Sequence, residues 1–231
     1  MRILSTMGLA GILHHYGPEF EATHRLTLDI TLLPTVKLLE QIRAGARGDL
    51  AILTADGIDA LVAEGVLQRR IDLARSFVGL AVRAGAPHPD IASPEAFVAT
   101  LLAARSVVIS EAGASGIFMA GLLRRLGIEA AMRDKTIVLP SGYTASLVAD
   151  GRAEIAIQQI SELMVVDGVD IVGRLPAELG GQTLFSAARF HGAADAASAQ
   201  ALAQSLADPA RAPLYRQCGL EHAGMLPPNR S

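Results

Sequence analysis

The sequence predicts an α/β chain in which short buried strands run into helices through turns of small polar residues. Three stretches have this order: residues 2–14, residues 50–61, and residues 106–127, which read SVVISEAGASGIFMAGLLRRLG. In the last stretch a β-branched apolar run precedes a Gly/Ser turn, and apolar residues then recur at helical spacing until Gly127. Strands that alternate with helices in this way predict mostly parallel sheets with helices on their faces.

The composition bounds the class of protein. The chain has 231 residues, of which 51% are hydrophobic and 19% charged, enough for one large domain or two lobes with sizeable cores. A net charge of −3 gives no electrostatic footprint for nucleic acid. With one cysteine, Cys218, no internal disulfide can form, and we interpret it as a structural thiol.

Neither a membrane span nor a metal site is expected. No run approaches the ~18 apolar residues that a spanning helix needs. Strand-like residues follow Met1 directly, so no leader is expected; the protein is periplasmic if a leader has been removed and cytoplasmic otherwise. No two histidines stand at i, i+4 and no Cys/His cluster occurs, so we expect neither a metal nor a cofactor.

The first half of the chain alternates strands and helices. Pro34 fits the start of a helix that Gly45 and Gly48 close, and Ser93-Pro94 starts another helix after the clearest composition break. Asp56 is a possible N-cap. The expected strands are residues 2–4, 22–32, 49–53 and 74–84, and the expected helices are residues 7–14, 34–44 and 57–64.

The second half repeats the same logic. The expected strands are residues 107–109, 136–139, 154–158, 170–174 and 182–190; the helices follow residues 115, 143 and 159, with further helices at residues 194–206 and around Leu214. We interpret the apolar run 74–84 and the extended run 182–190 as two crossings between lobes. Two lobes whose turns face a central cleft form a hinged binding architecture.

The turns carry hydroxyl groups that favour an anion site. The strand–turn–helix order is clearest at three strands, and a hydroxyl residue follows each of them. These residues are Ser5 and Thr6 after the first strand, Thr54 after the second, and Ser110 and Ser115 after the third. A strand that turns into a helix points free backbone N–H groups and hydroxyls at one spot. Any one of these residues can be merely a helix cap. Three such turns together predict a cleft for a small anion.

The whole chain resembles a known family. The stretches RILSTM, GDLAILTADGIDALVAEG, ARSFVGLAVRAGAPHPDIASPEAF, and RAEIAIQQISEL with VDIVGRLP carry the resemblance. They are similar to the molybdate-binding-protein-like branch of bacterial periplasmic (type II) solute-binding proteins. This implies a two-lobe fold with two extended hinge crossings: residues 1–80 with 185–231, and residues 81–184. It also implies a monomeric receptor that closes on a small oxyanion or carboxylate and docks to an ABC transporter permease.

The resemblance also implies a set of ligand-binding residues. In this family hydroxyls and helix N-terminal N–H groups hold the anion without a metal. The matching positions here are Ser5, Thr6, Thr54, Ser76, Ser110, Ser115, Gly116 and Ser141, with Gln158 and Gln159, and with Arg75 as a carboxylate clamp. A site for a tetrahedral oxyanion is usually neutral, yet Glu111 and Glu162 lie in or near these turns, where a carboxylate repels an anion.

Two alternatives stay open beside the receptor. The same branch resembles aconitate isomerase, which moves a proton across an allylic system in a small tricarboxylate; the candidate catalytic groups are then Glu111, Glu162 and His14, with Arg25 or Arg75 as clamps. The other alternative is a cytoplasmic ligand sensor. Plainer interpretations also exist: His14 ends the first helix, Arg75 pairs with Asp72 or a backbone carbonyl, Glu162 caps Gln159, and Tyr143 packs.

Overall fold

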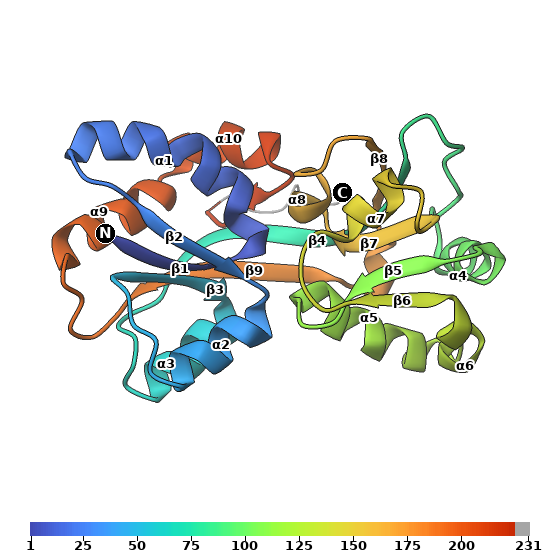
Figure 1. Cartoon of the computed structure of the whole chain (residues 1–231), viewed down its shortest axis with the longest axis horizontal. Coiled ribbons are helices and arrows are strands. Elements are labelled where there is room, and N and C mark those ends of the chain that lie inside the picture. The colour runs from blue at the N-terminus through green and yellow to red at the C-terminus, as the bar shows by residue number, and fades with distance from the viewer. Residues whose placement is uncertain (225–231) are drawn as a thin grey trace. The chain divides into compact units, whose positions relative to one another are not determined.

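The chain folds into two compact units. A computed structural model describes residues 1–224 (Figure 1). One unit contains Met1–Ser76 and the chain from Thr183 onward, and the other contains Phe77–Gln182. The expected lobe bounds at residues 80/81 and 184/185 stay predictions, and residues 225–231 of the expected first lobe lie outside the described residues. Within residues 1–224, no helix combines the length and the apolar character needed to cross a membrane.

The sheet of the first unit is parallel at its centre. Strand β1 (Arg2–Thr6) pairs in parallel with β2 (Asp29–Leu33) and with β3 (Leu50–Thr54). Strand β9 (Gln182–Arg189) runs antiparallel beside β3, and β10 (Glu221–His222) pairs antiparallel with the start of β4 (Ile71–Arg83). The carboxyl ends of β1, β2 and β3 therefore meet at one edge.

Helices cover both faces of this sheet (Figure 1). Leu13 of α1 (Ala10–His24), Leu202 of α9 (Ala196–Leu206) and Tyr215 of α10 (Ala212–Gln217) belong to the core on one face. On the other face, Leu38 of α2 (Thr35–Arg43) and Ile58 of α3 (Ala55–Ala63) belong to the second core. Two short 3-10 turns, η1 (Met7–Leu9) and η4 (Pro209–Arg211), precede α1 and α10.

The prediction for residues 7–32 is wrong in its boundaries. The first helix does not end near His14 but continues to His24, and the next strand begins only at Asp29. The buried stripe of α1 continues through Tyr16 to Phe20, and His24 stacks on Phe20 with ring centroids 4.1 Å apart. Packing against the core thus extends the helix past Pro18, and the alternating pattern from residue 22 is only partly a strand.

The second unit is built from a second parallel group. Strand β5 (Val107–Ser110) pairs in parallel with β6 (Thr136–Leu139) and with β7 (Ile155–Gln159). The second half of β4 runs antiparallel to β7 and to β8 (Val169–Arg174). The ends of β5, β6 and β7 at Ser110, Leu139 and Gln159 therefore lie on the same edge of this sheet.

Two helical layers enclose this second sheet. The core on one face contains Phe97 of α4 (Pro94–Ala103) and Met119 of α5 (Ala114–Arg125). The other core contains Val148 of α7 (Thr144–Ala149) and Leu163 of α8 (Ile160–Leu163). The remaining short helices are α6 (Glu129–Met132), η2 (Arg133–Lys135) and η3 (Ala177–Leu179).

Helix α5 starts unusually close to the strand that precedes it. An ideal Cβ atom on Gly116 would lie 1.7 Å from the carbonyl oxygen of Ser110, and one on Gly113 would lie 2.7 Å from the Ser110 Oγ. Such distances are far inside van der Waals contact, so a side chain at Gly116 cannot fit unless the backbone moves. Glycine at these positions allows the helix N-terminus to approach the end of β5.

We expect Gly116→Ala to destabilise the protein strongly, by about 3 kcal/mol or more, because the added methyl group forces α5 away from β5. Gly121→Ala on the same helix is the control: its Cβ would meet nothing nearer than Arg125 Nη1 at 3.9 Å. This control should be neutral or stabilising by about 0.5–1 kcal/mol. Urea unfolding checks both variants, and equal stabilities would contradict this account of the turn.

Candidate functional site

The polar residues of the second unit gather at the carboxyl edge of its sheet. Ile109 of β5 pairs with Ile157 of β7, so Ser110 and Gln158 are neighbours where the two strands end. Each strand then enters a helix, β5 through the Gly/Ser turn into α5 and β7 directly into α8. The predicted serines after β5 and the predicted glutamines at the end of β7 therefore lie at the same edge of one sheet.

A small polar cradle lies between the end of β5 and the start of α5. The Ser110 Oγ accepts a hydrogen bond from the Gly113 N–H at 3.0 Å, and Ser110 is 4% exposed. The Ser115 side chain is 0% exposed, and its Oγ has no hydrogen-bond partner among residues 1–224. The position of an ideal Cβ on Gly113 is 2.7 Å from one hydroxyl oxygen and 3.8 Å from the other. Because Gly113 has no side chain, space remains between the hydroxyl groups of Ser110 and Ser115.

The backbone of α5 adds further donors to this cradle. The first N–H groups of an α-helix have no carbonyl partner within the helix, and the helix dipole favours an anion at this end. Ala114 and Ser115 supply such N–H groups beside the unpartnered Ser115 hydroxyl. Burying a hydroxyl without a partner costs about 1–3 kcal/mol, so an acceptor that reaches Ser115 would recover that energy.

Gln158 organises the neighbouring turn. Its Oε1 accepts hydrogen bonds from the N–H group of Thr144 at 2.8 Å and from the Thr144 hydroxyl at 2.9 Å. Its Nε2 donates to the carbonyl oxygen of Gly142 at 3.3 Å. The amide of Gln158 therefore fills the N-terminus of α7 and fixes the turn after β6. Thr144 follows a Ser-Gly turn in the same strand–turn–helix order but is not among the residues predicted from the sequence.

A buried carboxyl group follows directly after β7. Glu162 is 6% exposed, and its Oε2 has no hydrogen-bond partner in the described part of the chain. Burial raises the pKa of Glu162 to about 7, although hydrogen bonds from the backbone at Gln159 and the side chain of Gln158 act in the opposite direction. Near neutral pH this carboxyl group is therefore divided between its protonated and ionised forms.

Tyr143 interacts with the same carboxyl group. Burial raises the pKa of the Tyr143 phenol, and the charge on Glu162 raises it further. The phenol is thus neutral near neutral pH. The interpretation that Tyr143 packs stays a prediction.

The other predicted residues of this unit lie in different surroundings. Glu111 is exposed, and its backbone N–H donates to the carbonyl oxygen of Leu139 at 2.9 Å. Ser141 is exposed in the turn before α7, and Gln159 is 1% exposed at the end of β7. Of the two carboxylates that the sequence singled out, only Glu162 is buried.

The first unit has its own group of hydroxyls at the carboxyl edge of its sheet. Ser5 is 0% exposed and donates to the carbonyl oxygen of Thr6 at 3.0 Å. The hydroxyl oxygens of Thr6 and Thr35 lie 3.3 Å apart, both buried. Thr35, the first residue of α2, follows the second strand–helix boundary, after Pro34, and is not among the residues predicted from the sequence.

Thr54 is the cap of the helix that follows it. Its Oγ1 accepts a hydrogen bond from the Gly57 N–H at 3.3 Å. The expected N-cap, Asp56, instead lies within the first turn of α3. The Thr54 hydroxyl is therefore a helix cap. It still has its O–H donor and one acceptor lone pair at the carboxyl end of β3.

The predicted cationic and histidine candidates are dispersed. Arg75 Nη1 donates to the carbonyl oxygen of Ala223 at 2.9 Å, which is one of its two plainer interpretations. Ser76 is 0% exposed on β4. Arg25 ends α1 before β2, at the amino edge of this sheet rather than the carboxyl edge, and His14 is exposed in the middle of α1. The interpretation that His14 ends the first helix is wrong, because α1 continues for ten residues beyond it.

No group of three His, Cys, Asp or Glu side chains lies together in a metal-binding arrangement within residues 1–224. Cys218 is buried, and burial raises the pKa of its thiol. An inert structural thiol fits these surroundings.

Fold and sequence place the chain in the class of periplasmic-type binding proteins. The periplasmic molybdate-binding protein of Azotobacter vinelandii has a similar fold, with a TM-score of 0.79 and 16% identity over 98% of this chain and 99% of that one. The sulfate-binding protein of Mycobacterium tuberculosis has a TM-score of 0.73 and 14% identity over 97% and 87%. At these identities the likeness establishes the fold, and it confirms the predicted α/β periplasmic-binding-protein-like architecture.

Sequence similarity then gives the family. Residues 1–221 match the family described as bacterial extracellular solute-binding protein. An aconitate isomerase from Pseudomonas sp. is 32% identical over 229 residues, covering 96% of this chain and 87% of that protein. The chain belongs to this solute-binding protein family, so the expected resemblance is confirmed.

Glu162 predicts a specific dependence of stability on pH. The ordinary pKa of a glutamate side chain is 4.5, and that of Glu162 in the folded protein is about 7. Between these two pH values the folded protein therefore binds more protons than the unfolded chain does. The stability contributed by the protonated group is fully present below about pH 4.5 and is lost as pH rises through about 7.

We expect Glu162→Gln to gain stability relative to wild type on going from about pH 4.5 to about pH 8, by up to about 3 kcal/mol. Urea unfolding at both pH values measures this difference. Glu111→Gln, which removes an exposed carboxylate from the neighbouring turn, is the control. Parallel pH profiles for wild type and Glu162→Gln would contradict the assignment of a buried titrating carboxyl group.

Proposed function

We propose that the protein binds a small anionic solute through the hydroxyl groups at the carboxyl edge of the second unit's sheet. The observation that carries this proposal is the Ser115 hydroxyl, buried and without a partner at the N-terminus of α5. Together with the first N–H groups of the helix it offers donors that an anion can accept from. Family membership supports the proposal, because solute binding is the family's described role.

The 32% identity to the Pseudomonas aconitate isomerase supports a carboxylate ligand over an inorganic oxyanion. An ionised Glu162 would repel any bound anion, whereas its protonated form can donate a hydrogen bond to an oxygen of the anion. Burial makes the protonated form available near neutral pH. The Tyr143 phenol, neutral at these pH values, adds a second donor. We therefore propose a small organic acid as the ligand class, with molybdate-like oxyanions as the competing class.

Family membership also supports a role in transport. We propose that this chain serves an ABC transporter permease as a periplasmic monomer. That the family is extracellular supports this location. Ligand binding is the part of the proposal that can be tested on the isolated protein.

Ligand binding should raise the melting temperature. Citrate, cis-aconitate and trans-aconitate are compared with molybdate, tungstate and sulfate; a ligand at about 100 Kd should raise Tm by about 5 °C or more. Ser115→Ala should weaken carboxylate binding about tenfold, because a charge-assisted hydrogen bond is lost. Ser198→Ala on α9 is the control. Stabilisation by oxyanions alone would overturn the carboxylate assignment, and unaltered binding to Ser115→Ala would overturn the site.

A second candidate function is isomerisation of a small unsaturated carboxylate. The buried Glu162 and the 32% identity to the Pseudomonas aconitate isomerase favour it. In this reaction ionised Glu162 would remove a proton from the carbon next to a double bond, and the electron pair would shift across the allylic system. The protonated carboxyl group would then return the proton to the far carbon. No atoms are gained or lost, and a group with a pKa of about 7 suits both steps.

Catalysis is separated from binding by following aconitate absorbance from both isomers. An isomerase brings cis- and trans-aconitate to the same equilibrium mixture, and Glu162→Gln should then reduce kcat by about 100-fold or more while Kd changes only a few-fold. Glu111→Gln tests the other predicted base and should retain nearly the wild-type rate. Aconitate binding without interconversion would leave a receptor, and full activity of Glu162→Gln would contradict the proposed base.

A further inference from the structure

The side-chain amide of Gln158 is enclosed within the second unit, although the family resemblance implies that it binds ligand. Gln158 is 2% exposed, and Thr144, which contacts it, is 0% exposed. A glutamine amide can accept two hydrogen bonds at Oε1 and donate two from Nε2. In a buried position these atoms need partners. The partners that they have decide whether Gln158 can still serve a ligand.

Thr144 fixes the direction of this amide. A backbone N–H group can only donate, so the amide atom 2.8 Å from the Thr144 nitrogen is the oxygen Oε1. The Thr144 hydroxyl donates to the same oxygen at 2.9 Å. On the other side Nε2 donates to the carbonyl oxygen of Gly142 at 3.3 Å, and a carbonyl oxygen can only accept. The flipped orientation of the amide is therefore excluded.

The second hydrogen of Nε2 serves Glu162. Gln159 is the N-cap of α8, and the carboxyl group of Glu162, three residues later, accepts a hydrogen bond from the backbone at Gln159. The Gln158 side chain also hydrogen-bonds to this carboxyl group. Because Oε1 faces Thr144, Nε2 is the donor. The amide thus accepts twice from Thr144 and donates to Gly142 and to Glu162, which leaves no bonding position for a ligand.

We propose that Gln158 is a positioning residue rather than a ligand donor: Thr144 fixes the direction of its amide, and the amide holds a donor hydrogen against Glu162. A donor at this place stabilises the ionised carboxylate and so opposes the effect of burial. Thr144 acts through Gln158, because donation to Oε1 polarises the amide and strengthens the bond from Nε2. This inference rests on the proposed function, in which Glu162 meets the ligand.

A titration of Glu162 in the intact protein without ligand tests this role. Carboxyl ¹³C resonances of labelled glutamate are followed from about pH 4 to pH 9, and Glu162→Gln identifies the resonance by its loss. The wild-type midpoint is expected at about pH 7. The Tyr143 phenol, which also interacts with Glu162, has a raised pKa and stays neutral over this range.

Gln158→Met should move the midpoint upward by about one pH unit, the tenfold change in proton affinity that follows loss of a hydrogen bond to a charged group. Thr144→Val removes the hydroxyl but keeps the backbone N–H, so it should move the midpoint in the same direction by less. Thr144→Ser retains a hydroxyl and should titrate like the wild type.

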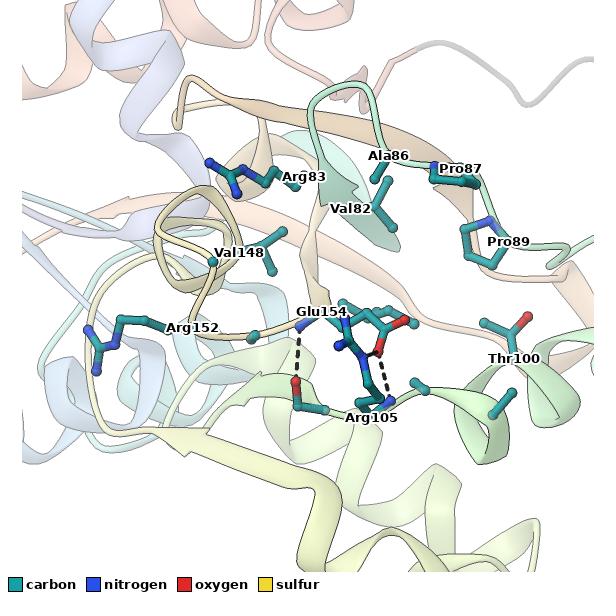
Figure 2. Close-up of a pocket in the computed structure, with 16 residues that line it drawn as sticks. Val82, Arg83, Ala86, Pro87, Pro89, Thr100, Arg105, Val148, Arg152 and Glu154 are labelled. Carbon is teal, nitrogen blue, oxygen red and sulfur yellow. Dashed lines mark hydrogen bonds and ion pairs between the residues drawn. The ribbon is translucent and has the colours of Figure 1, made fainter.

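Two controls separate this effect from a general change in structure. Thr136→Val removes a hydroxyl that donates to the carbonyl oxygen of Met132 at 2.8 Å, at the far end of β6, and should leave the midpoint unchanged. Glu154, just before β7, is an internal reference. Its Oε2 accepts from the backbone N–H and the Nε of Arg105 at 2.8 and 3.2 Å, as Figure 2 shows. Its resonance should titrate alike in all these variants.

An unmoved or lowered midpoint in Thr144→Val and Gln158→Met would overturn the inference. So would a Thr144→Ser protein that titrates like Thr144→Val, because the hydroxyl would then have no effect. Far-UV circular dichroism shows whether each variant folds, and if Gln158→Met does not, the two Thr144 variants decide.

Carboxylate binding, measured by thermal shift, reports separately on the proposed function, because these variants leave Ser115 unchanged. When carboxylates bind, the pH at which their affinity falls should rise in Thr144→Val together with the Glu162 midpoint. Shifted midpoints in a protein that binds no anion would contradict the proposed function alone. Normal binding with unshifted midpoints would contradict only the positioning role of Gln158 and Thr144.

Discussion

The approach of α5 to the end of β5 is the constraint on which the candidate site depends. Gly116 lets the first helical turn pass so close to the Ser110 carbonyl that a methyl group would occupy the same space. This contact holds the N–H groups of the turn and the Ser115 hydroxyl at the carboxyl edge of a parallel sheet. Because neighbouring parallel strands end at the same edge, β7 brings Gln158 and Glu162 to it.

Burial gives this edge its chemical character. The amide of Gln158 fixes the α7 turn. One carboxyl oxygen of Glu162, Oε2, has no hydrogen-bond partner in the described residues. A carboxyl group with a pKa of about 7 can accept or donate a proton without a large change in pH. The same property lets it tolerate an anionic ligand and makes it a possible base. Both ligand binding and isomerisation would therefore use the same group of residues at this edge of the sheet.

Much of the fold could be predicted from local sequence, because strand–turn–helix order and apolar runs are local signals. The α5 turn, the start of α4 at Pro94 and the strands β5 to β8 all follow from such patterns. The length of α1 could not be predicted, because packing of Tyr16 and Phe20 on the first core outweighs Pro18 and the later alternation. Local sequence patterns do not determine which face of a helix will pack against the core.

The site could be predicted only in part. The Gly-rich turn predicts Ser110 and Ser115 as candidate site residues. Spacing alone does not indicate that the hydroxyls of Thr35 and Thr144 contact Thr6 and Gln158, because these contacts join separate segments of the chain. The state of Glu162 depends on burial, and burial depends on tertiary packing that no spacing reveals.

The most direct test of the central claim is a titration of ¹⁵N-labelled protein with a small carboxylate such as citrate or trans-aconitate, followed by amide chemical shifts. The account predicts saturable changes that are largest at the N–H groups of residues 113–116, with further changes around Glu162. Saturable binding that leaves residues 110–116 unperturbed would contradict it, because the ligand would then be held by other residues.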